Sequence, residues 1–543
     1  MTDFHKKSIQ SLLSEKRLAE AFAELRQTAQ TLQNWQLNNR LDELEESYKY
    51  MIRYVADGCN DPQREEIHNG ITAKLMELAD ITEQELTVQN SPKLYYETLR
   101  MERKYPRSLE ALLEAYRECA DKTTLFYELP ADKRDSDQER TLLMEKEKAA
   151  NAVFKHIWVT FPVTANEAGT LDKLFADADA TAEIKELAMA ATMLSLLEHY
   201  SEHLLLSLLD LYAANAFNDA SLSMKALCCA LIAMHCHRET IKHSSAISLR
   251  IANIADSERG RRDIMTVFLQ FIRSRSTERI SQKVRDELVP KLMKLSPEMR
   301  RKMRDGFSDD IEEMAKNPDW QEMLNESGIT DKMQELSRMQ AEGSDVFLSS
   351  FARLKSFPFF NDVANWFVPF TPRHSSIFRV FAGNSGSMLL SMVDRTGAFC
   401  DSDKFSFALS VATMPDQHRS MMMAQFDEQQ EQVINEMAGS LPNPDKQREN
   451  IANKYVQSLY RFFNLFRSRN DFYNPFSTRL NLIDVPFVSD ALSDTKSLRL
   501  IAEFYFSMQC YTDALSTFGK VLKQDSPTAS DYQKTGYCHE QLK

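Results

Sequence analysis

A run of regularly spaced apolar and small residues near the C-terminus constrains the fold more than any other feature of the chain. Its members are Leu498, Ile501, Ala502, Tyr505, Ala514, Phe518 and Val521, and Pro527 follows them. Residues three and four apart lie on one face of a helix, so this spacing predicts two amphipathic helices that pair through their apolar sides. The small residues Ala502 and Ala514 let the two helices approach closely. Tyr505 and Phe518 are expected to fill the space between this pair and the next.

This pattern resembles the tetratricopeptide repeat, in which a large residue, a Leu-small pair and a Tyr are followed by Ala-x3-Phe and a terminal proline. Leu498 stands in the place of the usual Trp, and Ile501 stands in the place of Leu. The resemblance covers only residues 491–543. It implies helical hairpins that stack and form a groove for a peptide or a helix. The alternative is a generic amphipathic hairpin, which gives a similar spacing.

A second unit of the pattern begins directly after the first. The positions of its first helix that repeat the spacing are Tyr532, Thr535, Gly536 and His539. The sequence ends at Lys543, before a second helix, so we expect one complete unit and one truncated unit. Members of the family that clamp a terminal carboxylate use Lys, Asn and Arg on their first helices. Here Arg499 is the main basic residue near that face, so the resemblance does not imply this specialised role.

The composition predicts a folded and mostly helical protein. Hydrophobic residues make up 43% and charged residues 27% of the 543 residues, as in ordinary folded chains. Only 13 Gly and 17 Pro are present, which disfavours β-rich and loop-rich architectures. The abundance of Ala, Leu, Glu, Lys and Arg favours helix. A net charge of −13 argues against nucleic-acid binding by the whole surface.

The same sequence predicts a cytoplasmic location. No apolar run reaches the roughly 18–20 residues that cross a bilayer, so we expect no membrane span. The N-terminus lacks the apolar segment of a signal peptide. Eight cysteines are scattered along the chain, which is typical of reduced thiols that fill a core.

Hydrophobic periodicity divides the chain into four regions of an all-α protein, arranged as an α-solenoid of helical hairpins. Residues 1–170 are expected to be an N-terminal region of helical hairpins, and residues 171–344 have the rhythm of a HEAT- or armadillo-like array. Residues 345–490 are interpreted as an aromatic-rich helical junction, and residues 491–543 carry the tetratricopeptide units. The helices predicted within the array span 184–200, 203–216, 221–235, 241–255 and 264–274.

Three further segments admit both a structural and a functional interpretation. The aromatic residues of 347–370 predict a packed junction, with an exposed partner-binding patch as the alternative. The basic stretch 273–304 is interleaved with acids and lacks aromatic residues, so a solvated face is favoured over phosphate contacts. The loop 383–387 is rich in glycine but lacks the lysine of a P-loop, so it is expected to be a turn.

The sharpest catalytic candidate is the motif His199-Tyr-Ser-Glu202-His203. It matches the H-x-x-E-H pattern of inverted zinc peptidases, in which two histidines one helical turn apart hold zinc. In that interpretation His199 and His203 are metal ligands, Glu202 is the general base, and a distant acid is the third ligand. The apolar residues on both sides of the motif favour instead a helix packed among helices.

A second cluster of residues of metal-binding types lies further along the chain. Its members are Cys228, Cys229, His235, Cys236, His237 and His243. No C-x2-C pair with a matching partner pair is present, so the spacing of a structural zinc site fails. Buried cysteines on an Ala- and Leu-rich helix are the better interpretation.

Together these features predict a non-catalytic helical-repeat scaffold that binds another protein, as a peptide or a helix in the repeat groove. This function requires no cofactor. The alternative is a zinc-dependent hydrolase that uses His199, Glu202 and His203. Nucleic acid is the less favoured partner, because it would depend on the basic stretch alone.

Overall fold

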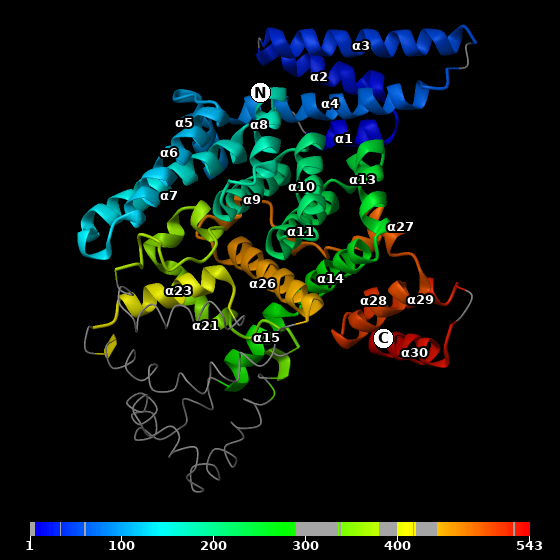
Figure 1. Cartoon of the computed structure of the whole chain (residues 1–543). Helices are drawn as coiled ribbons and strands as arrows, with labels where there is room; N and C mark the ends of the chain where they lie inside the picture. The colour runs from blue at the N-terminus through cyan, green and yellow to red at the C-terminus, as the bar shows by residue number, and fades with distance from the viewer. Residues whose placement is uncertain are drawn as a thin grey trace.

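The computed structural model describes residues 6–32, 34–58, 61–288, 335, 338–340, 342–379, 399–415, 418–419, 443–524 and 527–543. Every regular element in these ranges is helical and none is a strand, which confirms the predicted all-α class. Successive helices pack on one another from an N-terminal layer to the C-terminal helices on the opposite side of the molecule (Figure 1). The glycine-rich loop 383–387 and the part of the basic stretch 273–304 that follows residue 288 lie outside the described ranges. Within those ranges, no helix is both long and apolar enough to cross a membrane.

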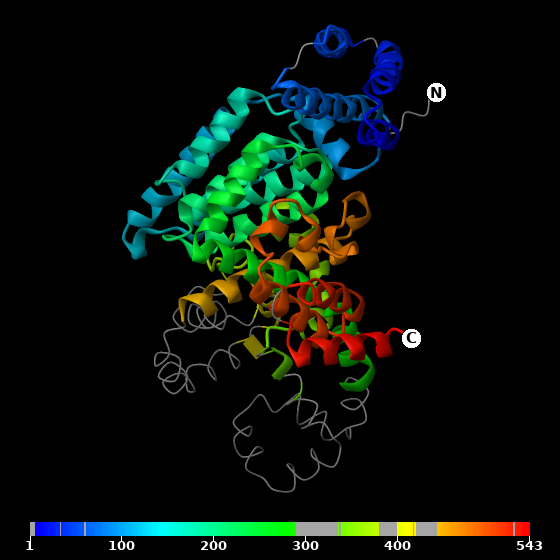
Figure 2. The same ribbon diagram turned by 90° about the vertical axis from the view of Figure 1, so that its right-hand side faces the viewer.

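The N-terminal layer has a hydrophobic core of its own. Its helices are α1 (Lys6–Ser14), α2 (Leu18–Leu32), α3 (Trp35–Ala56) and α4 (Arg64–Thr87). Leu25, Leu41 and Leu75 are fully buried within this core. Phe161 joins the same cluster from much further along the chain. Figure 2 shows the layer in dark blue, above the central helices.

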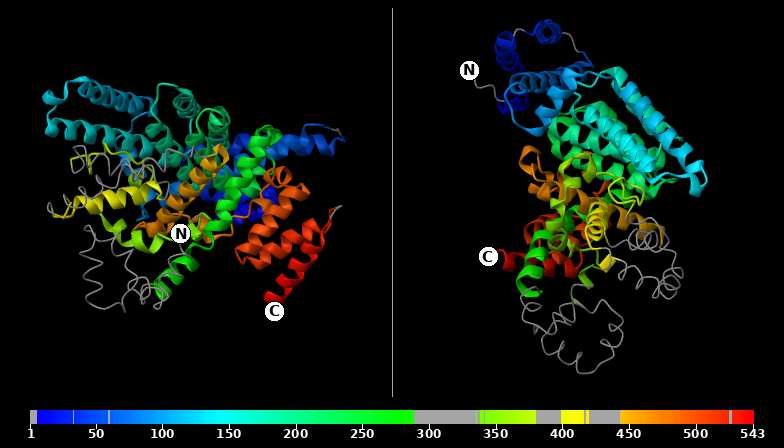
Figure 3. Two further views of the ribbon diagram at one scale, coloured as in Figure 1. Left: turned by 60° about the horizontal axis from the view of Figure 1, so that its bottom comes forward. Right: turned by 90° about the vertical axis from the view of Figure 1, so that its left-hand side faces the viewer.

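A long hairpin and two shorter helices connect this layer to the centre. They are α5 (Leu94–Lys104), α6 (Leu109–Glu128), α7 (Ser136–Val159) and α8 (Ala165–Ala176). The long helices α6 and α7 lie side by side, as Figure 3 shows. Ser108, Asp135 and Thr164 each accept a hydrogen bond from the backbone N–H three residues later, and these caps set the starts of α6, α7 and α8.

The central helices correspond to the five helices predicted between residues 184 and 274, although the last of them begins six residues earlier than predicted. They are α9 (Ala182–Glu198), α10 (Glu202–Asn215), α11 (Ala220–Cys236), α12 (Arg238–Ile241), α13 (Ser245–Asp256) and α14 (Glu258–Ser274). The helix predicted over 241–255 is wrong at its start, because the chain forms the short α12 and then begins α13. Ser244 explains the new start, since its hydroxyl accepts a hydrogen bond from the backbone N–H of Ile247.

One helix from late in the sequence, α26 (Pro444–Leu465), packs against the central helices α11 and α14. Its buried Arg448 donates from Nε and Nη2 to the two carboxylate oxygens of Asp263 on α14, at 2.8 and 2.6 Å. Asp263 also accepts a hydrogen bond from the Tyr212 hydroxyl of α10 at 2.8 Å. A single carboxylate therefore joins three helices that are far apart in the sequence.

The aromatic segment lies against the far end of α26 and forms short elements. These are α21 (Leu348–Ala352), η3 (Arg353–Ser356), η4 (Pro358–Asn361) and η5 (Ala364–Trp366), followed by α23 (Asp401–Ala412). Phe359, Phe360, Trp366 and Phe367 are all buried. Phe367 lies 4.9 Å from Phe462 of α26 between ring centroids. The alternative of an exposed aromatic patch is wrong at these four side chains, because helices α23 and α26 cover them.

The segment that follows these aromatic residues is held on α7 by a partly buried carboxylate. Glu147 accepts hydrogen bonds from both the backbone N–H and the hydroxyl of Ser375. Burial raises the pKa of the Glu147 carboxyl from 4.5 to about 7. The groups around it are Lys146 of α7, which pairs with Glu183 of α9, and His374, whose Nδ1 lies 3.6 Å from the carboxylate.

This carboxylate should make the stability of the protein depend on pH. Between pH 4.5 and 7 the unfolded chain releases the Glu147 proton while the folded chain keeps it. Unfolding therefore becomes easier as the pH rises, by up to about 3 kcal/mol. Burial lowers the pKa of His374 to about 4, which gives an effect of opposite sign between pH 4 and 6.5. Glu147→Gln should remove the first effect only, and urea titrations of both proteins from pH 4.5 to 7.5 would measure the difference. If the difference between the two free energies of unfolding stayed constant across this pH range, the raised pKa of Glu147 would be contradicted.

Candidate functional site

The residues of the predicted repeat form the two facing sides of a helical hairpin. Its helices are α28 (Thr495–Ser507) and α29 (Tyr511–Val521), which pack against each other. All seven patterned side chains of the hairpin are buried: Leu498, Ile501, Ala502, Tyr505, Ala514, Phe518 and Val521. Pro527 lies in the connection to the next helix, α30 (Ala529–Gln541). Spacing alone thus identified the buried faces of both helices.

The hairpin is fixed to the rest of the molecule through α14 and α15 (Thr277–Lys283). The Tyr505 ring meets the Phe268 ring of α14 edge-on, with 6.2 Å between centroids. The Arg275 guanidinium lies 2.7 Å from the Asp513 carboxylate of α29. Arg279 donates to the side chain of Gln509 at 2.6 Å. The prediction of a solvated basic face is therefore wrong at Arg275, whose side chain is largely covered by the C-terminal hairpin, whereas Arg279 contacts the hairpin and stays exposed.

Helix α30 repeats the spacing of α28 but leaves the corresponding face uncovered. In α28 those positions are Leu498, Ile501, Ala502 and Tyr505, and in α30 they are Tyr532, Thr535, Gly536 and His539. We call these four residues of α30 the open face. The Tyr532 side chain is 57% exposed, whereas the corresponding Leu498 is 5% exposed. Gly536 is exposed, and a Cβ added there would meet nothing within 4 Å, whereas the corresponding Ala502 is fully buried.

The opposite side of α30 is anchored by polar contacts. Asp531 is fully buried and accepts hydrogen bonds from Arg499 of α28 and from the backbone N–H of Thr528. Arg499, the basic residue nearest to a carboxylate-clamping position, is thus engaged inside the repeat. Cys538 is also fully buried against α29. These contacts hold α30 against the hairpin, while Tyr532, Gly536 and His539 of the open face stay exposed and Thr535 is half-buried.

The H-x-x-E-H motif does not form one helical turn. Helix α9 ends at Glu198 and α10 begins at Glu202, so His199 precedes the break and His203 follows it. The hydroxyl of Ser201 accepts a hydrogen bond from the backbone N–H of Leu204 and so starts the second helix. The expectation that both histidines share the face of one helix is wrong. The signal that the sequence offered was Ser201 itself, a good N-cap residue inside the motif.

The three motif side chains also have different surroundings. The buried His199 ring stacks on Phe161 with 4.4 Å between centroids. The Nε2 atom of His203 lies 2.9 Å from the Asp172 carboxylate in an exposed pair. Glu202 accepts a hydrogen bond from the Ser244 hydroxyl. Across the part of the chain that the structure describes, no three His, Cys, Asp or Glu residues are grouped so that they could hold a metal ion.

The cysteines of the second predicted cluster fill the core. Cys228 and Cys229 are fully buried on α11, and burial raises the pKa of both thiols. The Cys229 thiol lies 3.2 Å from the hydroxyl of Tyr455 on α26. His237 follows the end of α11, and its Nε2 is hydrogen-bonded to the backbone carbonyl of Leu196. These side chains connect helices, as the structural interpretation expected.

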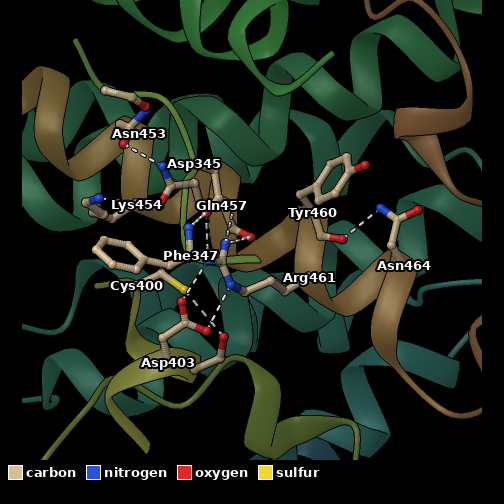
Figure 4. Close-up of polar contacts among 12 residues, drawn as sticks. Asp345, Phe347, Cys400, Asp403, Asn453, Lys454, Gln457, Tyr460, Arg461 and Asn464 are labelled. Atoms are coloured by element: carbon tan, nitrogen blue, oxygen red, sulfur yellow. Dashed lines mark hydrogen bonds and ion pairs between the residues drawn. The ribbon is translucent and has the colours of Figure 1, made fainter. Parts of the chain in front are cut away.

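A buried ionic cluster joins α26 to the segment before α21 and to α23. Arg461 lies between Asp345 and Asp403, with nitrogen–oxygen distances of 2.7 Å to each carboxylate (Figure 4). The ammonium of Lys355 lies 3.0 Å from Asp403 and donates to Ser406. Burial alone would lower the pKa of Arg461, yet the two aspartates raise it well above its ordinary value. The side chains of this cluster are at most 3% exposed, so it holds the fold together and is closed to ligands.

A polar cavity of about 170 Å³ lies where the N-terminal layer meets the central helices. Glu77 and Asp80 of α4 form one wall, and Glu198, at the end of α9, forms another. Tyr200 and Tyr473 also line it. Sequence reasoning missed this cavity entirely. Its residues come from segments that are far apart in the sequence. Tyr200 lies inside the H-x-x-E-H motif, and Cys236 and His237 belong to the second cluster, but neither pattern indicates that these segments meet.

Comparison of the whole chain with protein-family models, with curated proteins and with solved structures gives no match. The functional interpretation therefore depends on the geometry described above.

Proposed function

We propose that this protein is a non-catalytic α-solenoid scaffold whose C-terminal repeat binds a helix of a partner protein. The observation that carries the proposal is the open face of α30. Its spacing matches that of α28, whose corresponding residues are buried by the helices around them. A helix face with the small residues Thr535 and Gly536 at its centre lets a neighbouring helix approach closely, as small residues do where repeat helices stack.

The pairing of α28 with α29 provides a template for the expected partner. Helix α29 contributes a small residue, Ala514, and an aromatic residue four positions later, Phe518, and both are fully buried. A partner helix with the same small-x3-aromatic spacing would place its small residue against Gly536 and its aromatic ring near Tyr532. Helix α30 is the last helix of the described chain and lies at the lower right of Figure 1.

The substitution Gly536→Arg tests this proposal. A side chain at this position meets nothing within 4 Å, so the variant should fold normally and gain about 0.5–1 kcal/mol from better helix propensity. It should nevertheless block helix docking. We expect the affinity for the partner segment to fall at least about 30-fold, as for loss of a central interface residue.

The matched control is Gly519→Arg on α29, where an added Cβ also meets nothing within 4 Å. A photo-crosslinking amino acid at position 536 would first identify the partner and the segment of it that binds. Titration of that purified segment against the unsubstituted protein and the two variants would then give the three affinities. Equal affinities of the Gly536→Arg and Gly519→Arg variants would refute binding at the open face.

A further inference from the structure

The end of the α3–α4 hairpin, which we call the tip, is left uncovered by the other described helices. Residues 52–58 and 62–67 are all exposed. Figure 1 shows α3 and α4 running past the start of α2 at this end of the N-terminal layer. Six of the seven residues 50–56 are nevertheless aromatic or aliphatic, and Ile52 and Tyr54 are 46% and 59% exposed. A helix that is apolar all round is normally buried, so the tip has the composition of a contact surface.

The apolar seam of α3 continues into this tip. Its residues follow one another at alternating steps of four and three, which is the spacing of a helix that packs against a neighbour along its length. They are Leu37, Leu41, Leu44, Tyr48, Met51 and Val55. The first four belong to the core of the N-terminal layer or pack against it, whereas Met51 and Val55 do not. The seam of α3 is therefore longer than α2, the helix that covers it.

Ile52 lies on the side of α3 along which α2 packs. It follows Glu45 by seven residues, which is two helical turns on the same side, and Glu45 is paired with Arg26 of α2. Phe22 of α2 lies 5.7 Å from Tyr48 between ring centroids, and α2 begins only four residues before Phe22. Helix α2 is thus too short to cover Ile52, and a further helix can lie there as its continuation.

The charges at the tip have opposite signs on the two helices. Arg53 follows Ile52 in the last turn of α3, and Glu65 and Glu66 precede Ile67 in the first turn of α4. The helix dipoles favour these signs at these ends. In the part of the chain that the structure describes, none of the three charged side chains forms an ion pair. A helix that begins with acids and an aliphatic residue would complement the place beside Ile52, and α4 of a second copy begins in this way.

From the continuity of the seam and the complementarity of the charges we propose that the tips of two copies pair about a two-fold axis, with the start of α4 in one copy against the end of α3 in the other. Ile67 of one copy then faces Ile52 of the other, and the two glutamates face Arg53. The symmetry forms this contact twice, so both uncovered places are filled at once. The contact is small, and we expect a dissociation constant of about 1–100 μM. The inference is independent of the open face of α30, which lies in the C-terminal part of the chain.

Sedimentation equilibrium of the full chain between about 1 and 200 μM tests the pairing. Ile52→Asp should raise the dissociation constant at least about 30-fold, because it places a charge at the centre of the contact. The matched control is Leu249→Asp on α13, where the side chain is 61% exposed and the dimer should be unaffected. A full chain that stays monomeric at every concentration would overturn the inference in favour of a different protein as the occupant, and so would a dimer that Ile52→Asp leaves intact.

Charge reversal distinguishes pairing of the tips from any other self-association. Arg53→Glu should weaken the dimer about tenfold, because repulsion replaces an exposed attraction at two equivalent places, and a chain with both Glu65→Arg and Glu66→Arg should behave alike. An equimolar mixture of these two variants should associate as tightly as the unsubstituted protein, because opposite charges face each other again in the mixed dimer. Arg107→Glu, at an exposed position between α5 and α6, is the control. The inference is overturned if Arg53→Glu dimerises like this control, or if the mixture associates no better than either variant alone.

Discussion

Replacement of Arg461 by Met is expected to lower the free energy of unfolding of the protein by about 3–5 kcal/mol. Arg461 is the only cation that contacts both Asp345 and Asp403 among the described residues. Its loss leaves Asp345 buried without that partner, and Asp403 keeps only Lys355. An uncompensated charge that is 1–3% exposed cannot recover its hydration, and this cost dominates the loss of the ion pair itself.

The control for this prediction is Arg467→Met. Arg467 follows the same helix α26, but it is exposed and donates only to Asn361 at 3.3 Å. A surface change of this kind should alter the free energy of unfolding by about 0.5 kcal/mol or less. Urea titrations of the two variants followed by circular dichroism would measure both effects. If the Arg461 variant is as stable as the Arg467 variant, the buried cluster does not hold the fold together.

Truncation of Phe518 to Ala is expected to destabilise the C-terminal hairpin by about 3–5 kcal/mol, as for other buried aromatic side chains. Phe518 is fully buried in α29, which packs on both α28 and α30. The cavity left by the truncation cannot collapse readily. The ion pairs of Asp513 with Arg275 and of Asp531 with Arg499 keep the surrounding helices from moving into it. The effect should therefore be concentrated in the last three helices.

Hydrogen exchange separates a local effect from a global one. In the Phe518→Ala variant, amides of α28 and α29 should exchange much faster, while those of α10 and α11 keep their protection. Leu500→Ala is the matched control, because this side chain on α28 is 48% exposed and should cost little. Equal protection of the hairpin in both variants would show that the repeat pattern does not mark its core.

The sequence was informative where local physical rules act alone. The helices predicted over 184–200, 203–216 and 221–235 agree with the structure to within two residues at each end, because apolar periodicity acts over short distances. The buried face of α28 was predicted from the spacing of Leu498, Ile501 and Tyr505.

The sequence was uninformative where the fold joins distant residues. Arg461 and its two aspartates are separated by more than fifty positions, and ordinary charged residues at such separations carry no signal of pairing. Arg275 was assigned to a solvated face for the same reason, since nothing local reveals that Asp513 will lie beside it. The three carboxylates of the polar cavity come from two helices whose meeting depends on the whole fold. The H-x-x-E-H motif shows the opposite error. A short pattern suggested a metal site, but its residues lie apart in the folded protein.

The separate core of α1–α4 has a consequence for how the molecule responds to stress. A protein with two separate hydrophobic cores can unfold in two stages, because unfolding of one core does not expose the other core to water. The polar cavity lies at the seam between them, with Asp80 on one side and Glu198 on the other. A molecule bound there in contact with both sides would bind the folded protein only. It would therefore stabilise the N-terminal layer, and the two unfolding transitions would coincide.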